Sequence, residues 1–470
     1  MTRTTADRVR ELRPGQADEA KDLFPSEWRE ELFLRLRALP PATKRIEPRA
    51  HRTARRTVLG ALAAAVALLA AATSYSLVVA RSHHAHPPEM RLVSVVTPIF
   101  LEVGTSRAEG RLQCPGPSTC YLWDVGPSAA SYKSTDGGRR WTGIVTPPVS
   151  GVTVPTCSTA RNCMAVYSAP DEASQLSPVP VAVTADGGSH WAKRSLNVPS
   201  YVTYPVVWTV LSNLQGFATC ATATKCVALV AGQRGSSPAI ALWSFLTSNA
   251  GRSWRQGSLV STWGPDALPQ GLGAALGCSP DGQCTSVGLM GPIRQARGVA
   301  AFHSANYGQT WQAEPPATRA PVGGSAFAFP FNNPLATCAD GTHCAVLYRG
   351  TTQAGGFWLT STTDGGRTWQ THRAKAAGNY PVGLSCWGAS CWVSWSTETI
   401  SGGVIVTRHP VVEGTDDSGA TWSQVPLASV PGLQEVVSLS CPSKEGCVAI
   451  ARSGDPGHSA RYMVLSDLPR

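Results

Sequence analysis

Fourteen cysteines constrain the fold of this 470-residue chain more than any other feature, and none of them precedes residue 114. They fall into seven close pairs: Cys114 with Cys120, Cys157 with Cys163, Cys220 with Cys226, Cys278 with Cys284, Cys338 with Cys344, Cys386 with Cys391, and Cys441 with Cys447. The enclosed segments, such as PGPST, SPDGQ and ADGTH, consist of turn-forming residues, and runs such as CVALV and CAVLY flank them. Each pair therefore predicts a β-hairpin with one cysteine at the end of each strand.

The chemistry of these pairs favours disulfides over zinc. Facing Cβ atoms on paired strands lie about 4.5–5.5 Å apart, which a modest adjustment brings to disulfide distance. A structural zinc site needs four ligands, whereas each hairpin offers two, with no regular histidine nearby. We expect seven disulfides, each fixing the register of one hairpin in an oxidising compartment.

A second element, the octapeptide STDGGRRW at 134–141, recurs five more times as a Ser/Thr-x-Asp/Asn-x-Gly-x-x-Trp motif. Its four defining positions are Ser134, Asp136, Gly138 and Trp141; Thr184, Asp186, Gly188 and Trp191; Thr247, Asn249, Gly251 and Trp254; Ser304, Asn306, Gly308 and Trp311; Thr362, Asp364, Gly366 and Trp369; and Thr415, Asp417, Gly419 and Trp422. The third positions are spaced by 50, 63, 57, 58 and 53 residues. A near-constant period of this length indicates a repeat architecture, with propeller blades as the first candidate.

The residue types of the motif are those of a locked turn. The hydroxyl and the carboxylate can accept hydrogen bonds from nearby backbone amides. The glycine can adopt a positive φ, and the tryptophan can bury a large aromatic face against the sheet. Strand-like stretches lie on both sides of each motif, so we expect the motif to connect two strands.

This pattern resembles the Asp-box, also called the bacterial neuraminidase repeat. Asp-boxes occur in β-propellers, including sialidases, sortilin-type ectodomains, some glycanases and propellers like the photosystem II assembly factors. The resemblance covers roughly residues 91–470 and implies an all-β propeller. Asn249 and Asn306 depart from the pattern, but asparagine keeps the carbonyl acceptor, so the turn survives and a metal-binding role is not expected.

The order of the two elements predicts the number of blades. Each cysteine pair precedes its motif by 16 to 26 residues, so one unit reads as strand, cystine hairpin, strand, strand, Asp-box, strand. Seven pairs predict seven four-stranded blades, yet there are only six motifs. Asp467 lies 20 residues after Cys447, where the third position of the next motif would be expected. We therefore expect RLVSVVTP (91–98) to supply the outer strand of the last blade and to close the ring.

Residues 57–80, TVLGALAAAVALLAAATSYSLVVA, carry no charge and are long enough to cross a bilayer as one helix. The basic segment KRIEPRAHRTARR before them predicts a cytoplasmic N-terminus and an extracytoplasmic propeller. We expect an uncleaved signal anchor in the plasma membrane of a bacterium. The alternative is a twin-arginine export signal at Arg55-Arg56 with cleavage after Val78-x-Ala80, which would release a secreted form.

The predicted organisation is thus a cytoplasmic basic segment at 1–56, the membrane segment at 57–80, a linker at 81–90 and the propeller at 91–470. Within the cytoplasmic segment, residues 26–39 predict a short amphipathic helix, read either as a solvated juxtamembrane helix or as a docking helix. Three histidines in the linker (His83, His84 and His86) could bind a metal, but no carboxylate or cysteine accompanies them. We expect no metal and no cofactor.

Charge excludes a nucleic-acid partner. Of the net charge of +10, half comes from residues 1–56, which hold 14 basic and 9 acidic residues. The remaining residues hold 26 basic and 21 acidic side chains over more than 400 positions, which is too dilute for nucleic-acid binding.

The resemblance also raises the possibility of a sialidase or another glycoside hydrolase. Sialidases carry their first arginine in a Phe/Tyr-Arg-Ile-Pro motif near the start of the propeller, where this chain has TPIFLEV (97–103) without arginine. No catalytic residue can be assigned. We expect a non-catalytic, membrane-tethered scaffold that binds a protein or a cell-envelope glycan. The irregular stretches 263–273 and 318–334 would form a recognition rim or serve as ordinary connectors.

Overall fold

The computed structural model describes residues 90–96, 111–123, 131–148, 155–166, 179–197, 202–203, 218–234, 240–263, 275–290, 298–317, 335–349, 356–375, 380–401, 404–427, 429–444, 446–454 and 461–467. All of them belong to one compact unit, His86–Arg470. The predicted membrane segment at 57–80, the cytoplasmic helix and the histidines of the linker lie outside the described residues. Within the described ranges no helix has the length and hydropathy needed to cross a membrane.

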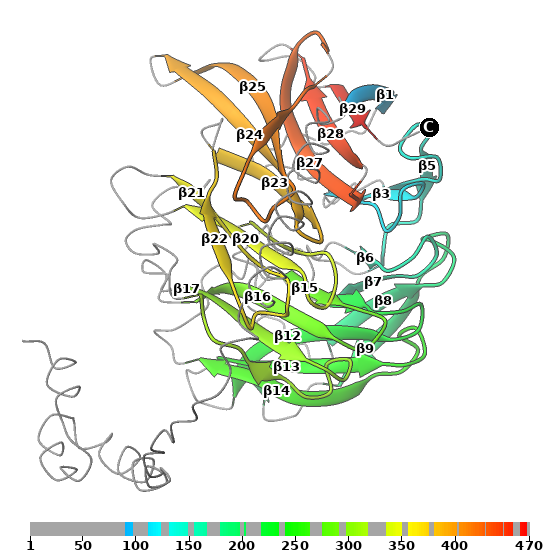
Figure 1. Ribbon diagram of the computed structural model, residues 1–470. Coiled ribbons are helices and arrows are strands. Elements are labelled where there is room, and N and C mark those ends of the chain that lie inside the picture. The colour runs from blue at the N-terminus through cyan, green and yellow to red at the C-terminus, as the bar shows by residue number, and fades with distance from the viewer. Residues whose placement is uncertain are drawn as a thin grey trace, which may run out of the picture. The chain divides into compact units, whose positions relative to one another are not determined.

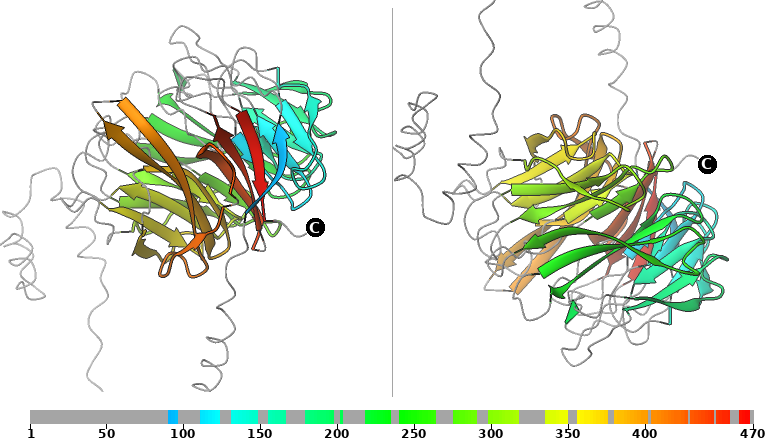
Figure 2. Two further views of the ribbon diagram at one scale, coloured as in Figure 1. Left: turned by 90° about the horizontal axis from the view of Figure 1, so that it is seen from above. Right: turned by 90° about the horizontal axis from the view of Figure 1, so that it is seen from below.

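The described residues form seven antiparallel sheets, which confirms the predicted seven-bladed β-propeller (Figures 1 and 2). We number the blades by their cysteine pairs. Blade 1 comprises β2 (Arg111–Gln113), β3 (Cys120–Trp123), β4 (Ser131–Ser134) and β5 (Thr142–Ile144). Blade 2 comprises β6 (Thr156–Cys157), β7 (Cys163–Val166), β8 (Val179–Thr184) and β9 (Ala192–Leu196). Blade 3 comprises β11 (Ala218–Cys220), β12 (Cys226–Arg234), β13 (Ile240–Thr247) and β14 (Arg255–Trp263). Blade 3 differs from the expected four strands, because β10 (Val202–Thr203) also pairs with the far end of β12.

Blades 4 to 6 repeat the four-stranded order. Blade 4 comprises β15 (Ala275–Cys278), β16 (Cys284–Met290), β17 (Gly298–Ser304) and β18 (Gln312–Ala313). Blade 5 comprises β19 (Leu335–Cys338), β20 (Cys344–Arg349), β21 (Phe357–Thr362) and β22 (Gln370–Arg373). Blade 6 comprises β23 (Tyr380–Trp387), β24 (Ser390–Ser401), β25 (Val404–Thr415) and β26 (Ser423–Val425). The first strands of successive blades contact one another, so they lie nearest the axis and the fourth strands form the outer edge.

Blade 7 combines the two ends of the propeller. It comprises β27 (Leu433–Ser443), β28 (Gly446–Ser453) and β29 (Arg461–Ser466), with β1 (Arg91–Val96) as its outer strand. β1 runs antiparallel to β29 and pairs Arg91 with Ser466 and Val96 with Tyr462 (Figure 1, β1 in blue beside β29 in red). The predicted closing strand is therefore present, and contact between β27 and β2 of blade 1 completes the ring.

The core lies between blades rather than inside one layer. Each boundary between neighbouring blades holds one cluster of buried apolar side chains, seven clusters in all among the described residues. The second strands of the blades are buried at almost every position, as CYLW in β3 is, because a blade packs on both faces. This explains why the sequence shows short, almost continuous apolar runs rather than strict alternation.

Candidate functional site: the turn face

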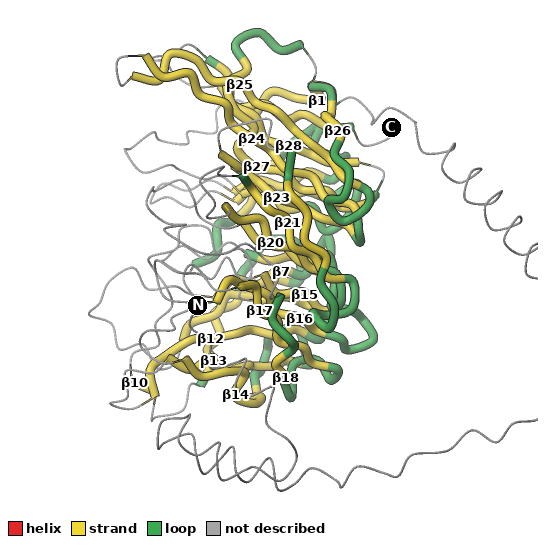
Figure 3. The backbone as a smooth tube through the Cα atoms, turned by 60° about the vertical axis from the view of Figure 1, so that its left-hand side comes forward, coloured by secondary structure: helices red, strands yellow, loops and turns green. Residues whose placement is uncertain are grey.

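Strand order places two kinds of turn at the same end of every blade. In an antiparallel sheet the connections between strands one and two, and between strands three and four, lie on the same side. The first connection is the cystine hairpin and the second is the repeated motif, here called the motif turn. The described turns gather along one edge of the sheets (Figure 3, green), and we call this edge the turn face.

The seven predicted disulfides are present, and among the described residues no cysteine is free. Each links the first strand of a blade to the second, so the bonds encircle the axis at the turn face. Hydrogen bonds beside them join neighbouring blades. The amides of Cys114 and Cys157 donate to Ser440 Oγ and to Gln113 Oε1, both at 2.9 Å, and the amide of Cys441 donates to Ser385 Oγ at 2.9 Å.

The hairpin of blade 6 differs from the predicted geometry. Cys386 and Cys391 are bonded as expected, but they are separated by five positions rather than six. Trp387 and Ser390 pair beyond them, so β23 and β24 each continue one residue past the disulfide. The prediction that a cysteine ends each strand is therefore wrong here, and also in blade 7, where β27 and β28 continue past their disulfide. In blade 6 the shorter spacing leaves two residues for the turn, and the first, Gly388, takes the positive φ (59°) that such tight turns require.

Each motif turn is held by its first and third residues. In blade 1, Ser134 Oγ accepts from the amide of Gly138 at 2.9 Å, and the hydroxyl donates to Asp136 Oδ1 at 2.9 Å. Asp136 Oδ1 also accepts from the amides of Arg139 (3.0 Å) and Arg140 (2.9 Å). The bonds from the glycine amide to the hydroxyl and from the hydroxyl to the third residue recur in the other five turns.

Asparagine replaces aspartate without loss of these bonds. Asn249 Oδ1 accepts from the amide of Ser253 at 3.0 Å, and its amide nitrogen donates to Ser253 Oγ at 2.8 Å. In blade 6, Asp417 accepts both the amide and the hydroxyl of Thr421. Burial alone would raise the pKa of Asp417, but these hydrogen bonds outweigh it and hold the pKa below its usual value. The side chain thus acts as a hydrogen-bond acceptor for the loop.

The residue after the Asp or Asn connects the two turns of a blade. Its amide donates to the carbonyl two residues before the second cysteine in all six motif turns, as from Gly137 to Ser118 (2.8 Å) and from Ser418 to Ala389 (3.0 Å). This residue adopts positive φ in every copy, at 58° for Ala250, 56° for Tyr307 and 60° for Ser418. These three are the only non-glycine residues with positive φ in the described part of the chain, so the turn imposes its backbone even where the sequence lacks glycine.

The motif tryptophans belong to the boundaries between blades. Each packs on the cluster between its own blade and the preceding one; Trp141, for example, lies against the cluster of Val448, Ile450 and Val464 from blade 7. Trp191 and Trp369 also donate their Nε1 protons to carbonyls of the preceding blade, those of Val145 (2.7 Å) and Pro315 (3.0 Å). A motif turn therefore locks its loop and ties it to a neighbour.

Blade 7, which has no motif turn, uses Met90 and Asp467 instead. Met90 directly precedes the outer strand, the place that tryptophan takes in the other blades, and is 1% exposed in the cluster between blades 6 and 7. Its amide donates to the carbonyl of Pro426 at 2.9 Å, which follows the outer strand of blade 6. No pattern in the sequence marks this methionine; only its position just before the closing strand could have found it.

Asp467 takes the place of the missing turn. In the motif blades the first motif residue pairs with the second cysteine, as Ser134 does with Cys120. In blade 7 Ser466 pairs with Val448, so Asp467 lies opposite Cys447, in the place of the first motif residue. The Asp467 amide donates to the Cys447 carbonyl at 3.2 Å, and the carboxylate accepts the Cys447 amide. Burial, opposed by these hydrogen bonds, raises the pKa of Asp467 to about 6.

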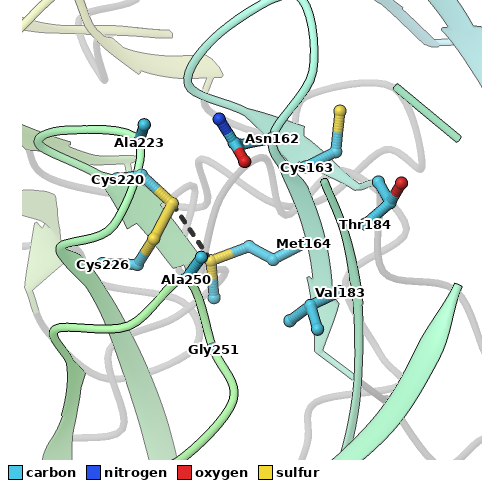
Figure 4. A pocket seen from close by; sticks show the side chains of 10 residues that line it. All are labelled: Asn162, Cys163, Met164, Val183, Thr184, Cys220, Ala223, Cys226, Ala250 and Gly251. Atoms are coloured by element: carbon cyan, nitrogen blue, oxygen red, sulfur yellow. Dashed lines mark hydrogen bonds between the residues drawn. A yellow bond between two sulfur atoms is a disulfide. The ribbon is translucent and has the colours of Figure 1, made fainter. Parts of the chain in front are cut away.

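Ten residues line a hollow between blades 2 and 3 on the turn face (Figure 4). Its lining includes Met164, Val183, Ala223 and the disulfide of Cys220, whose sulfur lies 3.5 Å from Met164 Sδ. A volume of about 10 Å³ corresponds to one water molecule. The boundary is filled by packing and offers no binding chemistry.

Two polar clusters on the turn face also join neighbouring blades. Lys133 Nζ and Tyr121 OH both donate to the carbonyl of Ala160, at 2.9 and 2.7 Å, across the boundary between blades 1 and 2. Between blades 4 and 5, His303 contacts Thr285 Oγ1 and Gln283 Oε1 at 3.0 and 2.6 Å. Burial, followed by the charge of Arg367, lowers the pKa of His303. No group of three or more potential metal ligands occurs within the described residues.

The structure brings the predicted residues of the motif together within each turn, but it leaves the six turns apart, one in each blade. The irregular stretches proposed as a recognition rim fall outside the described residues, except for Trp263 at the end of β14.

No protein-family model and no curated protein matches the sequence. Among solved structures, the chain is similar to YCF48 bound to D1 peptide, with 12% identity and a TM-score of 0.40, over 76% of this chain and 94% of that one. It is also similar to the GH74 enzyme of Niastella koreensis, with 14% identity and a TM-score of 0.46, over 80% of this chain and 54% of that one. An α-L-arabinanase of Penicillium chrysogenum matches at 12% identity and a TM-score of 0.34, over 80% and 97% of the two chains. These propellers include a peptide-bound protein and hydrolases, and identities this low bear on the fold alone.

Proposed function

We propose that this chain is a membrane-tethered, non-catalytic extracytoplasmic propeller with Asp-box turns, which binds a protein or a cell-envelope glycan. The observation that carries the proposal is the bonding of all fourteen cysteines in one cystine per blade. Disulfides of this number persist in an oxidising compartment and are rare in the cytosol. They support a propeller exported across the membrane.

The uncharged segment 57–80, preceded by a basic segment, supports a tether with its N-terminus in the cytoplasm. Only ten residues of sequence separate segment 57–80 from β1. The strand that closes the ring is therefore the first strand after the proposed anchor in the sequence. A reagent that labels only outer-face lysines, applied to intact cells, is expected to modify the propeller but not Lys21 or Lys44. Labelling of Lys21 and Lys44 alone would contradict the proposed orientation.

The state of the motif carboxylates supports a non-catalytic role. Asp136, Asp364 and Asp417 each accept backbone amides and the hydroxyl of their own turn. These bonds hold their pKa values below the usual value, against the effect of burial. A general acid needs a raised pKa and a free proton, which is the opposite arrangement.

Crosslinking in cells tests the proposed binding function. A photoreactive residue placed at exposed positions of the outer strands, such as Ser195 and Gln424, is expected to capture a specific partner on the outer face of the membrane. Recovery of nothing above the level of an uncrosslinked control would count against a scaffold. The same preparation is expected to leave a sialoside and a β-glucan panel intact, and turnover of either would favour the glycoside hydrolase alternative.

A further inference from the structure

The charge of the propeller is unevenly distributed around the ring. The sequence range 111–263, which includes the strands of blades 1 to 3, contains 11 basic and 5 acidic residues, whereas 264–470 contains 12 basic and 13 acidic residues. More than half of the basic residues of blades 1 to 3 lie at the outer edge, and blade 5 also has Arg367, Arg373 and Lys375 there. Six exposed basic side chains lie on or beside the outer strands of blades 1 to 3, and we call them the rim cations: Arg139, Arg140, Lys193, Arg194, Arg252 and Arg255.

Blades 4 and 6 provide the internal comparison. Where blade 1 has Arg139 and Arg140, blade 4 has Gln309 and Thr310, and blade 6 has Ala420 and Thr421. Their outer strands carry glutamine, alanine, serine and valine instead of lysine and arginine. The motif turn and the strand order are the same in these blades, so the fold does not require the rim cations.

Three of the rim cations donate hydrogen bonds to neighbouring oxygens. Arg139 donates from Nη1 to the carbonyl of Asp136 (3.3 Å), Arg194 from Nη1 to the carbonyl of Lys193 (2.8 Å), and Arg255 from Nη2 to Gln309 Oε1 (3.3 Å). All three acceptors are uncharged. A guanidinium has five donors, so each arginine keeps donors for a ligand while losing side-chain freedom.

In the part of blades 1 to 3 that the structure describes, two acids, both in motif turns, oppose this charge. The motif carboxylates nearby are Asp136 and Asp186, and blade 3 has the neutral Asn249. Asp186 already contacts His190 Nδ1 at 2.7 Å, and Asp136 accepts two backbone amides. Among the described residues, none of the rim cations forms an ion pair with a carboxylate within 4 Å.

The curvature of the ring selects the kind of anionic partner. Three adjacent outer strands out of seven span more than a third of the circumference. A flat bilayer touches such a convex edge at one or two blades, whereas a linear chain can follow it across all three. We propose that the outer edge of blades 1 to 3 binds a linear polyanionic glycan through the rim cations. This rests on the proposed extracytoplasmic scaffold and narrows its ligand to an acidic polysaccharide.

The test uses the full chain in nanodiscs of neutral phosphatidylcholine, with immobilised alginate as the carboxylated glycan and dextran as the uncharged one. Binding to alginate but not to dextran is expected, and it should weaken at least about tenfold between 50 and 200 mM salt because counterions are released on binding. Stronger binding to phosphatidylglycerol vesicles than to alginate would assign the edge to a membrane and overturn the proposal. Absence of alginate binding at low salt would overturn it as well.

A matched pair of variants separates the edge from net charge. Lys193→Gln/Arg194→Gln in blade 2 is expected to weaken alginate binding about tenfold. Arg367→Gln/Lys375→Gln in blade 5 removes the same charge from exposed positions on another part of the ring and is expected to have little effect. Equal losses in the two variants would show that net charge alone drives binding. If crosslinking captures a partner but alginate does not bind, the proposed scaffold is supported and the proposed glycan ligand is contradicted. If crosslinking captures no partner and alginate does not bind, both proposals are contradicted.

Discussion

Blade 7 and the six motif blades solve the same packing problem with different residues. In blades 1 to 6 one continuous segment supplies the third strand, the turn and the fourth strand, and a tryptophan fixes the turn to the preceding blade. In blade 7 the fourth strand comes from the other end of the propeller, Met90 fills the position of the tryptophan, and Asp467 bonds Cys447 in place of a turn. The boundary between blades needs a buried apolar side chain and a hydrogen-bonded cystine turn, and the repeated motif is one way to supply them.

The comparison also shows what the ring closure depends on. Each motif turn is a local contact of a few residues, whereas β1 and β29 are separated by more than 360 residues of sequence. A non-local pairing costs more chain entropy to form, and it must be strong enough to hold the ring closed. The next three predictions probe this difference, from the largest expected effect to the smallest.

Removal of the closing strand is expected to have the largest effect. A chain that starts at Pro98 lacks Met90 and β1, which exposes the edge of β29 and opens the cluster between blades 6 and 7. We expect it to be degraded by protease under conditions in which a chain starting at His86 is resistant. Equal resistance of the two chains would mean that β1 does not close the propeller.

Loss of a single boundary side chain is expected to have an intermediate effect. Met90→Ala should lower the free energy of unfolding by about 3 kcal/mol, as deletion of a fully buried methionine usually does. Trp311→Ala, its counterpart between blades 3 and 4, should cost a comparable amount. Urea denaturation of the oxidised protein measures both, with Met90→Leu as the volume-conserving control. A loss of less than about 0.5 kcal/mol in the free energy of unfolding for Met90→Ala would contradict the claim that Met90 takes the place of the motif tryptophan.

The pH dependence of stability is expected to distinguish Asp467 from the motif aspartates. The pKa of Asp467 is about 6 in the folded chain and near 4 in an unfolded one, so between these values only the folded state keeps its proton. The free energy of unfolding should therefore fall by about 2 kcal/mol as the pH rises from 4 to 6. Asp467→Asn should abolish this fall.

The motif aspartates change the free energy of unfolding with pH in the opposite direction. Their pKa values are lowered in the folded state, so their contribution is present above the unfolded pKa and is lost as the pH falls through the folded value. Asp417→Asn should therefore leave the pH 4–6 range unchanged and reduce the loss of stability in acid. A fall between pH 4 and 6 that persists in Asp467→Asn would assign it to another group.

The blade number, the disulfides and the closing strand could be predicted from the sequence because they depend on short, regular spacings. Seven cysteine pairs count the blades, and a last unit that lacks its fourth strand requires one from elsewhere. Met90 could not be predicted in the same way, because an isolated methionine carries no pattern and its role depends on a pairing made after the ring closes. The fifth strand of blade 3 was missed for a similar reason: β10 has only two residues and pairs beyond the repeat.

The candidate site was less predictable than the fold. The motif residues form turns that the sequence chemistry anticipates, and these turns hold themselves and their neighbours together. The rim cations are visible in the sequence only as scattered arginines and lysines. Their grouping emerges once blades 1 to 3 are adjacent and their fourth strands lie at the outer edge.

Closure of the ring by β1 can be tested directly by crosslinking within the chain. Val95 is the partner of Met463 in the antiparallel pair, where facing residues approach closely enough for a disulfide. Val95→Cys/Met463→Cys is expected to form an additional disulfide, identified by mass spectrometry of the unreduced protein, with the seven native bonds intact. Val95→Cys/Arg461→Cys, two residues out of register, is expected not to form one. Absence of the 95–463 bond, or equal yields from the two pairs, would contradict a propeller closed by its N-terminal strand.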